Sequence, residues 1–211
     1  LKGAATYVIQ TLPLLTPSSK FTISRVDLAR LVCDKDKGCL LTLLKFVMEG
    51  KIVVHTEIGL KELKFEEEIG SGTAGTVYKA TWKGINVAVE KFKDAQHDEF
   101  LRELSIMSIV QHENLVHCYG GCIQRDQQFL VLELMQANIS DLLRNKTQQL
   151  DLGIKLKVAI DAAKGMDYLH AHCNLIHRDL KSLNLLANQV DDDIVIKVCD
   201  FGVSRVVDKR K

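Results

Sequence analysis

The sequence predicts an α+β fold of two lobes, preceded by a small, mostly helical segment. Two observations support this prediction. Short apolar stretches separated by glycine-containing turns begin at Lys61, which is typical of an antiparallel sheet. A long stretch with helical periodicity comes later in the chain. Strands grouped first and helices afterwards indicate an α+β arrangement rather than regularly alternating strands and helices.

Residues 1–60 make up the helical segment in this interpretation. One helix is expected from Ser24 to about Cys33, and a second helix ends at Gly50. A short strand with the sequence KIVVH follows the second helix. The apolar face of the second helix consists of Leu40, Leu43, Leu44 and Val47.

The run DKDKG at 34–38 is similar to the start of a calcium-binding loop. A glycine occupies the fifth loop position, however, and Lys45 the twelfth, where a carboxylate is needed. We therefore expect a turn between two helices.

The first lobe, residues 61 to about 135, is expected to be mainly a sheet. Three strands have the sequences KFEEEIG, GTVYKATW and NVAVEKF. A helix over 98–110 follows, because Phe100, Leu104 and Met107 recur near helical spacing. The stretches LVHCYGG and QFLVLELM predict two further strands.

The second lobe, about 136–211, contains a long helix over 151–172. Its apolar positions recur at helical spacing, so this face is expected to be buried. The positions are Leu152, Leu156, Ala159, Ile160, Ala163 and Met166.

The composition limits the classes of partner. The chain has 211 residues, of which 46% are hydrophobic and 26% charged, as in ordinary globular proteins. Its net charge is +1, so overall charge does not favour nucleic acid or an anionic membrane as a partner. The longest apolar run, at 40–48, is too short for a bilayer and contains Lys45. We expect no nucleic acid partner and no membrane segment.

The six cysteines form no CxxC pair. In a chain of this length they are expected to be free thiols in a reducing compartment, which predicts a cytoplasmic location. The first residue is Leu rather than Met, so we expect the natural N-terminus to lie further upstream.

A glycine-rich motif, GSGTAGTV, occupies residues 70–77 between two expected strands. Glycines let backbone N–H groups approach phosphate oxygens closely. A dinucleotide-binding turn would have to open a helix, so the placement between strands argues against it. Taken alone, the motif fits a plain hairpin equally well.

Two further motifs are HRDLKSLNLL at 177–186 and DFG at 200–202. The glycine loop, a strand containing VAV, HRDLKxxN and DFG, in this order, resemble the signature set of eukaryotic protein kinases. The resemblance covers about 61–211. The sequences TWKGINVAV, HENLV and HRDLKSLNLL are most similar to the tyrosine-kinase-like group of Ser/Thr kinases.

This resemblance implies a protein Ser/Thr kinase in signal transduction, which transfers the γ-phosphoryl group of ATP to protein hydroxyls. The implied cofactors are ATP and Mg²⁺, with Mn²⁺ as an alternative ion. The implied partners are a protein substrate and either an upstream activating kinase or a scaffold. Arg178 precedes the catalytic aspartate, an arrangement that in the family often accompanies control by a phosphorylated activation segment.

The resemblance also assigns the nucleotide site residue by residue. Asp179 would accept the proton of the substrate hydroxyl, Lys181 would contact the transferred phosphate, and Asn184 and Asp200 would hold the metal. Glu103 is the glutamate of the conserved helix, and Met107, one turn later, would pack on Phe201 and His177. Leu132 would be the gatekeeper, with Glu133, Leu134 and Met135 as the hinge. The nucleotide would further contact Ile69, Gly70, Ser71, Gly72, Thr73, Ala74, Gly75, Thr76, Val77, Ala88 and Leu186.

One position departs from the kinase pattern. A lysine that holds the phosphates and pairs with the helix glutamate is expected after VAV, but the sequence has Glu90 followed by Lys91. Side chains alternate along a strand, so Glu90 shares a face with Ala88, and Lys91 reaches the site only if a bulge shifts the strand. Both residues are candidates for the nucleotide site. A repulsion between Glu90 and Glu103 of about 4 kcal/mol at about 4 Å predicts a catalytic handicap.

The chain stops nine residues after Gly202, so we expect a fragment or a truncated product that exposes apolar surface. The alternative function is therefore a pseudokinase or truncated kinase that acts as a binding or scaffold module. An ATP sensor that uses only the small lobe is a weaker third hypothesis.

Two clusters are similar to metal sites. His170, His172, Cys173 and His177 lie close in sequence, but their spacing fits no standard zinc pattern. The run DDD at 191–193 is expected to be a solvated turn between two strands.

Overall fold

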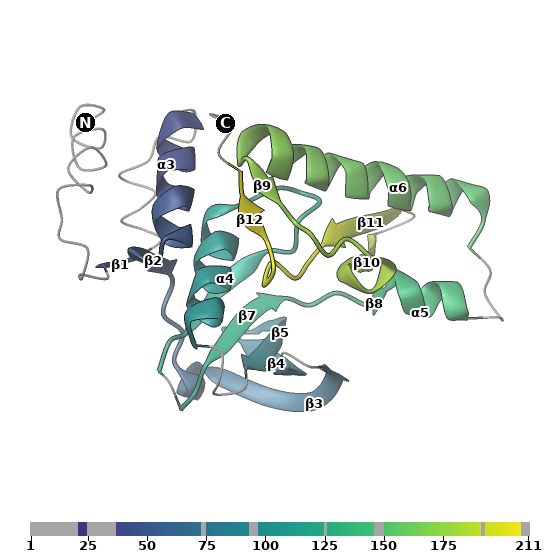
Figure 1. The fold of residues 1–211 in the computed structure, drawn as a ribbon. Helices are drawn as coiled ribbons and strands as arrows, with labels where there is room; N and C mark the ends of the chain where they lie inside the picture. The colour runs from purple at the N-terminus through teal and green to yellow at the C-terminus, as the bar shows by residue number, and fades with distance from the viewer. Residues whose placement is uncertain are drawn as a thin grey trace.

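The computed structural model describes residues 21–24, 37–72, 75–92, 97–124, 126–145, 150–190 and 193–207. A sheet and helix α4 (His97–Ile109) form one lobe, and the long helix α6 (Leu152–Asp167) spans the other (Figure 1). The two-lobed α+β prediction agrees with this arrangement. None of the helices in these ranges combines the length and the apolar character needed to cross a lipid bilayer.

The small-lobe sheet has five strands, and each strand pairs antiparallel with its neighbours. The ladder between β4 (Gly75–Trp82) and β5 (Ile85–Phe92) runs without a break, from the pair Gly75 and Phe92 to the pair Trp82 and Ile85. Their hairpin turns at Lys83 and Gly84, whose φ angles of 48° and 84° suit a tight turn between twisted strands. In pairing order the strands are β3 (Leu63–Ser71), β4 (Gly75–Trp82), β5 (Ile85–Phe92), β7 (Phe129–Glu133) and β6 (Cys118–Cys122).

Helix α4 packs its apolar side into the main hydrophobic core. Phe100, Leu104 and Met107 are all buried there, as their spacing predicts. Phe201 of the DFG motif lies in the same core. The helix and the DFG motif are therefore packed together.

The second lobe places the kinase-like motifs on short strands and turns. β10 (Leu185–Val190) pairs with both β8 (Ala137–Asn138) and β11 (Asp193–Val198). β12 (Arg205–Val206) pairs with β9 (Leu175–Ile176). Asp193 begins β11, whereas 191–192 lie outside the described residues. The elements are β8 (Ala137–Asn138), α5 (Ile139–Arg144), a π-helical turn (Tyr168–His172), β9 (Leu175–Ile176), a 3-10 turn (Ser182–Asn184), β10 (Leu185–Val190), β11 (Asp193–Val198) and β12 (Arg205–Val206).

Helix α6 buries a different face from the one predicted. Leu152, Leu156 and Ile160 are 71%, 54% and 52% exposed. The buried positions are Asp161, Ala162 and Gly165. A Cβ atom at 165 would come within 2.7 Å of the carbonyl oxygen of Asn114, so the small residues of this helix form its contact face.

The N-terminal segment contributes helix α3 (Lys37–Met48) and strand β2 (Ile52–His55), both predicted. Strand β1 (Phe21–Ser24) pairs with β2 in parallel. The helix predicted from Ser24 to Cys33 and the start of the DKDKG run lie outside the described residues, except that Ser24 ends β1. Buried residues of α3 and β2 belong to the same core as α4, so this segment is packed onto the small lobe.

Candidate functional site

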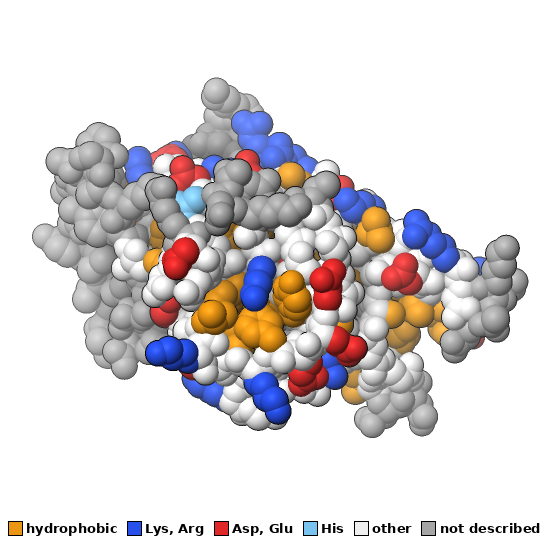
Figure 2. Space-filling view, turned by 90° about the horizontal axis from the view of Figure 1, so that it is seen from below, with side chains coloured by type: hydrophobic (Ala, Val, Ile, Leu, Met, Phe, Trp, Pro, Cys, Tyr) orange, Lys and Arg blue, Asp and Glu red, His pale blue; other side chains and the backbone are white. Residues whose placement is uncertain are grey.

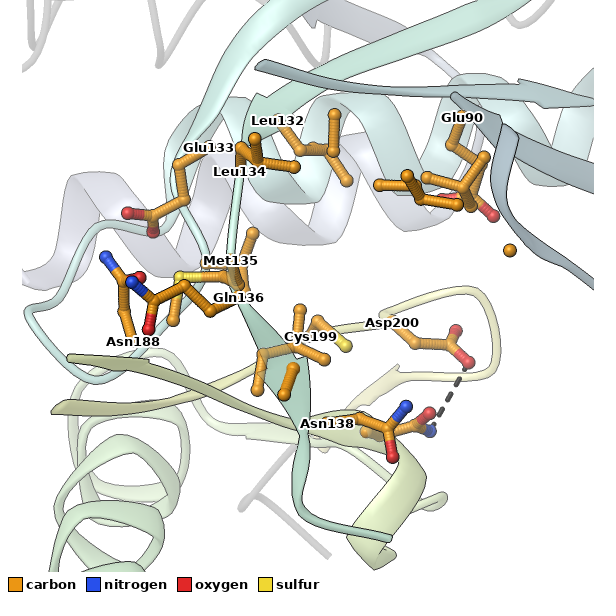
Figure 3. A pocket seen from close by; sticks show the side chains of 18 of the residues that line it. Glu90, Leu132, Glu133, Leu134, Met135, Gln136, Asn138, Asn188, Cys199 and Asp200 are labelled. Carbon is orange, nitrogen blue, oxygen red and sulfur yellow. Dashed lines mark hydrogen bonds between the residues drawn. The ribbon is translucent and has the colours of Figure 1, made fainter. Parts of the chain in front are cut away.

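A cavity of about 830 Å³ lies between the small-lobe sheet on one side and strand β10 with Cys199 and Asp200 on the other (Figure 3). This volume is within the usual range for a small-molecule site. Thirteen of the predicted site residues line it: Ile69, Gly70, Val77, Ala88, Glu90, Glu103, Leu132, Glu133, Leu134, Met135, Asn184, Leu186 and Asp200.

The apolar part of the cavity has two walls. Val77 and Ala88 come from β4 and β5, and Leu186 comes from β10. The segment after β7 connects the two walls. Several other lining residues lie in or after this segment, or on β4, β5 and β10. The sequence motifs did not predict them, because no motif assigns these residues a role in the site. They include Lys79, Asn86, Gln136, Ala137, Asn138, Asp141 and Asn188.

The carboxylate of the hinge residue Glu133 is bonded to other parts of the protein. Both oxygens of Glu133 accept hydrogen bonds at 2.8 Å from Nζ of Lys197, on β11. One oxygen also accepts the backbone N–H of His117 at 2.6 Å. The side chain therefore ties β7 to β11 and to the residue that precedes β6, and only the backbone of Glu133 is left to contact a ligand.

The glycine loop is partly described. Thr73 and Ala74 lie outside the described residues, and Ser71, Gly72, Gly75 and Thr76 are not among the cavity-lining residues. The N–H of Gly72 donates to the carbonyl of Gly75 at 2.9 Å. A Cβ atom at 75 would meet the carbonyl oxygen of Lys91 at 2.0 Å. Glycine is therefore required at 75 by the close approach of β5.

The HRD and DFG motifs meet through one amide. Nδ2 of Asn184 donates to the carbonyl of Asp179 at 2.9 Å and to its Oδ2 at 3.0 Å. The same nitrogen lies 3.3 Å from Oδ2 of Asp200 (dashed line in Figure 3). Lys181 donates to Oδ2 of Asp179 at 2.5 Å. The structure thus gathers four predicted catalytic and metal residues into one hydrogen-bonded group.

Lys181 also sets the charge of Asp179. Its hydrogen bond, together with its positive charge and the bond from Asn184, lowers the pKa of the Asp179 carboxyl. The pKa of Lys181 is raised in return. Asp179 is therefore held in its ionised form, which is the form that accepts a proton.

Two residues within these motifs have left-handed backbone conformations. The φ angles are 70° at Arg178 and 67° at Asp200, and such angles in non-glycine residues cluster at functional sites. The buried His177 ring lies 2.9 Å from the carbonyl of Cys199 and packs edge-on against Phe201. His177 is therefore used structurally. Among the described residues, no group of three histidine, cysteine or acidic side chains could hold a metal ion.

A family model described as protein tyrosine and serine/threonine kinase matches residues 63–211. The chain belongs to this kinase family. The predicted kinase fold and family are thus confirmed.

Named relatives of the kinase domain are serine/threonine kinases. A probable serine/threonine-protein kinase of Dictyostelium discoideum is 38% identical over 186 residues, which are 86% of this chain and 13% of that protein. STY46 of Arabidopsis thaliana is 42% identical over 156 residues, 71% of this chain and 26% of the relative. CTR1 of the same plant is 41% identical over 154 residues, 69% and 18% respectively. The chain thus spans about an eighth to about a quarter of these proteins.

Where other kinases carry a lysine, this kinase domain carries Glu90 and gathers three carboxylates. Glu90 lies on β5, and Figure 3 shows it and Asp200 at the same cavity. Burial and the charge of Asp200 raise the pKa of Glu90 to about 7. Burial, Glu90 and Asp200 raise the pKa of Glu103 well above its usual value, although a hydrogen bond from the Phe201 backbone opposes this shift. The predicted repulsion is therefore present in the folded chain.

Lys91, a predicted candidate for the nucleotide site, is not among the residues that line the cavity. The β4–β5 ladder is regular here, with Thr76 opposite Lys91, so no bulge turns the lysine inward. Its Nζ lies 4.1 Å from the ring centre of Phe65 and 5.0 Å from that of Tyr78. Figure 2 shows the molecule from below, with a basic side chain among hydrophobic ones near the centre of the view.

Lys79 does not replace the missing lysine either. Among the cavity-lining residues that the structure describes, it carries the one basic side chain. Its Nζ, however, is paired with Glu66 at 3.0 Å, and its neighbour across the ladder is Ala88 rather than Glu90. Among the described lining residues, no basic side chain therefore pairs with the carboxylates of Glu90, Glu103 and Asp200.

Proposed function

We propose that this chain is the nucleotide-binding part of a Ser/Thr protein kinase that transfers the γ-phosphoryl group of ATP to hydroxyls of protein substrates. The observation that carries the proposal is the amide of Asn184, which joins the proton acceptor Asp179 to Asp200. A chance arrangement of loop residues would not connect these two carboxylates, which derive from separate motifs, at hydrogen-bond distance.

The side chains of the catalytic loop have complementary roles. Asp179 is 35% exposed, so a substrate hydroxyl can reach it, and the ionised carboxylate accepts the hydroxyl proton as the oxygen attacks phosphorus. Lys181, 47% exposed beside it, offers positive charge to the transferred phosphate. Asn184 fixes the orientation of Asp179 by donating to both its carbonyl and its carboxylate.

The donor set also fits a divalent metal. Asn184 donates through Nδ2, which leaves its amide oxygen for a cation, and Asp200 adds a carboxylate. Oxygen ligands of this kind suit Mg²⁺, and Mn²⁺ accepts the same set. When bound, the metal would offset the negative charge of the phosphates.

The left-handed backbone of Asp200 helps to aim its carboxylate. Its Oδ1 accepts the N–H of Gly202 at 3.3 Å, so one oxygen is held by the turn while Oδ2 faces Asn184. Protein kinases in general use ATP with a divalent metal, and the identity of the nucleotide and ion for this chain is part of the proposal.

A second candidate function is a pseudokinase that acts as a binding or scaffold module. Glu90 favours it, since a carboxylate in place of the lysine repels the nucleotide phosphates and Glu103. We further infer a cytoplasmic location, and either an upstream activating kinase or a scaffold as partner, from the free cysteines and the RD loop.

Phosphoryl transfer distinguishes the two functions. The protein that contains this chain is incubated with radiolabelled ATP, Mg²⁺ or Mn²⁺, and a mixed Ser/Thr peptide library, as wild type, Glu90→Lys, and Glu90→Lys combined with Asp179→Asn. We expect slow transfer by the wild type, at least about tenfold faster transfer by Glu90→Lys, and loss in the double variant. If Glu90→Lys binds ATP but transfers nothing, the kinase proposal fails and the scaffold function is favoured.

A further inference from the structure

Helix α4 keeps Glu103 in the site without the usual counter-charge. The nearest acidic neighbours, Glu90 and Asp200, both disfavour its ionised form. One hydrogen bond, from the Phe201 N–H to Oε1 at 3.2 Å, faces the carboxylate from the DFG motif. This inward position of α4 therefore needs support from elsewhere in the fold.

Helix α3 and strand β2 provide a large apolar contact. Figure 1 shows α3 lying alongside α4, with β2 close to both helices. Residues of α3 and β2 share one hydrophobic core with α4 and Phe201. The N-terminal members of this core are Leu43, Leu44, Phe46, Val47, Ile52 and Val54. Because the core is continuous from α3 to the DFG phenylalanine, moving α4 away from the site would expose apolar surface on both sides.

A directed hydrogen bond adds to this packing. The backbone N–H of Val54 donates to Oγ of Ser105 at 3.0 Å, and Ser105 is fully buried. The hydroxyl in turn donates to the carbonyl of Leu101 at 2.7 Å. β2 is thus bonded to α4 two residues after Glu103.

The same segment is also fastened to the sheet. The N–H of Gly121 donates to the carbonyl of Thr56 at 2.9 Å, and the N–H of Ile58 donates to the carbonyl of Gly121 at 3.0 Å. Gly120 has a φ of 149°, and a Cβ atom there would meet the Thr56 oxygen at 2.1 Å. Gly120 therefore leaves room for this segment to dock against β6.

The match to the kinase family model begins at residue 63. We propose that residues 37–58, which precede this match, act as a built-in clamp. The clamp positions α4 so that Glu103 remains bonded to Phe201, although the lysine that fixes this helix in other kinases is absent. Residues of the clamp are positioning residues, because they act through α4 and do not line the cavity.

Hydrogen exchange of the Phe201 backbone N–H tests the clamp, because this N–H is bonded to Glu103 only while α4 is held in place. We would measure the exchange rate of the Phe201 N–H by NMR in the full chain without nucleotide, for wild type, Ser105→Ala, Leu44→Ala and Ser108→Ala. Ser108 is a matched control, since it is a serine buried on the same helix but does not carry the bond to Val54. Alanine is a better helix former than serine, so weakened helix propensity cannot explain an effect of Ser105→Ala.

We expect the Phe201 N–H to exchange about tenfold faster in Ser105→Ala and in Leu44→Ala, and within about twofold of wild type in Ser108→Ala. The amides of Leu130 and Val131, in the centre of the sheet, should keep their protection, which separates release of α4 from global unfolding. Unchanged Phe201 exchange in Ser105→Ala, or an equal increase in Ser108→Ala, overturns the clamp. If Leu44→Ala does not fold, Ser105→Ala decides alone. No nucleotide is present, so the result is independent of phosphoryl transfer.

Discussion

The carboxylate of Glu103 accepts a hydrogen bond from the backbone N–H of Phe201, a residue 98 positions later in the chain. This contact joins α4 to the DFG motif in a kinase domain whose phosphate-binding lysine is replaced by Glu90. The small lobe thus keeps Glu103 bonded to the DFG motif while lacking the usual positive charge.

Nucleotide affinity should depend strongly on the charge at position 90. Glu90→Lys removes a repulsion and supplies an attraction for the phosphates, so we expect Mg-ATP to bind ten to a hundred times more tightly, a change of about 1.4 to 2.7 kcal/mol. Isothermal titration calorimetry measures the change. Lys91→Met is the matched control, since that lysine packs on Phe65 and Tyr78 on the opposite face and should leave the affinity within about twofold. Equal effects of the two substitutions would contradict the assignment of strand faces.

Stability should fall as the pH rises toward neutrality. The pKa of Glu90 is raised from its ordinary 4.5 to about 7 in the folded chain, so the folded state binds a proton that the unfolded state has released. Its stabilising effect is complete below about pH 4.5 and is lost as the pH rises through about 7, at a cost of up to about 3 kcal/mol. Glu103, with a pKa raised for the same reason, acts in the same direction.

Urea unfolding between pH 5 and pH 8 tests this dependence. Glu90→Gln keeps the size of the side chain without its titration, so its free energy of unfolding should fall less with pH and exceed that of the wild type at pH 8. Glu68→Gln, on the exposed part of β3, serves as the control and should follow the wild-type curve. A Glu90→Gln curve parallel to the wild type would mean that the carboxyl at 90 ionises normally.

The thiol of Cys199, which lines the cavity immediately before the DFG motif, should react slowly. Burial and the charges of Asp200, Glu90 and Glu103 raise its pKa, and the thiolate is the nucleophilic form. We expect its alkylation by iodoacetamide at pH 8 to be more than about tenfold slower than that of a free cysteine. Glu90→Lys should accelerate it, as followed by peptide mass spectrometry.

The buried Cys173 provides an internal control for this measurement. It should remain unmodified in both proteins, because its exposure does not depend on the charge at 90. Rapid modification of Cys173 would show that the chain opens during the reaction. Rapid modification of Cys199 alone in the wild type would contradict the raised pKa.

The resemblance of single motifs to those of protein kinases predicted the parts of the site that lie within these motifs. Strand alternation was sufficient to place Glu90 inward, because the ladder contains no bulge. The pattern did not identify the buried face of α6, since the helix has apolar residues on more than one side and only tertiary contacts decide which is covered. Contacts between distant segments were missed for the same reason. Val54 and Ser105, 51 positions apart, carry no local signal of their hydrogen bond.

The ion pair between Lys197 and Glu133 should contribute measurably to stability. It is mostly buried, with side chains 18% and 20% exposed, and links β11 to the hinge. Lys197→Met leaves the carboxylate without its partner, so we expect a loss of about 2 kcal/mol and a coupling energy of about 1–2 kcal/mol in a double-mutant cycle with Glu133→Gln. Denaturant unfolding provides the four free energies.

The pair between Lys51 and Glu49 is the matched comparison for this cycle. Its atoms are as close, at 2.7 Å, but its side chains are 46% and 37% exposed, so solvent screens the attraction and the coupling should be below about 0.5 kcal/mol. Equal coupling in the two cycles would show that burial does not strengthen the hinge pair. A larger coupling at 133–197 would show that burial strengthens the pair that links the hinge to β11.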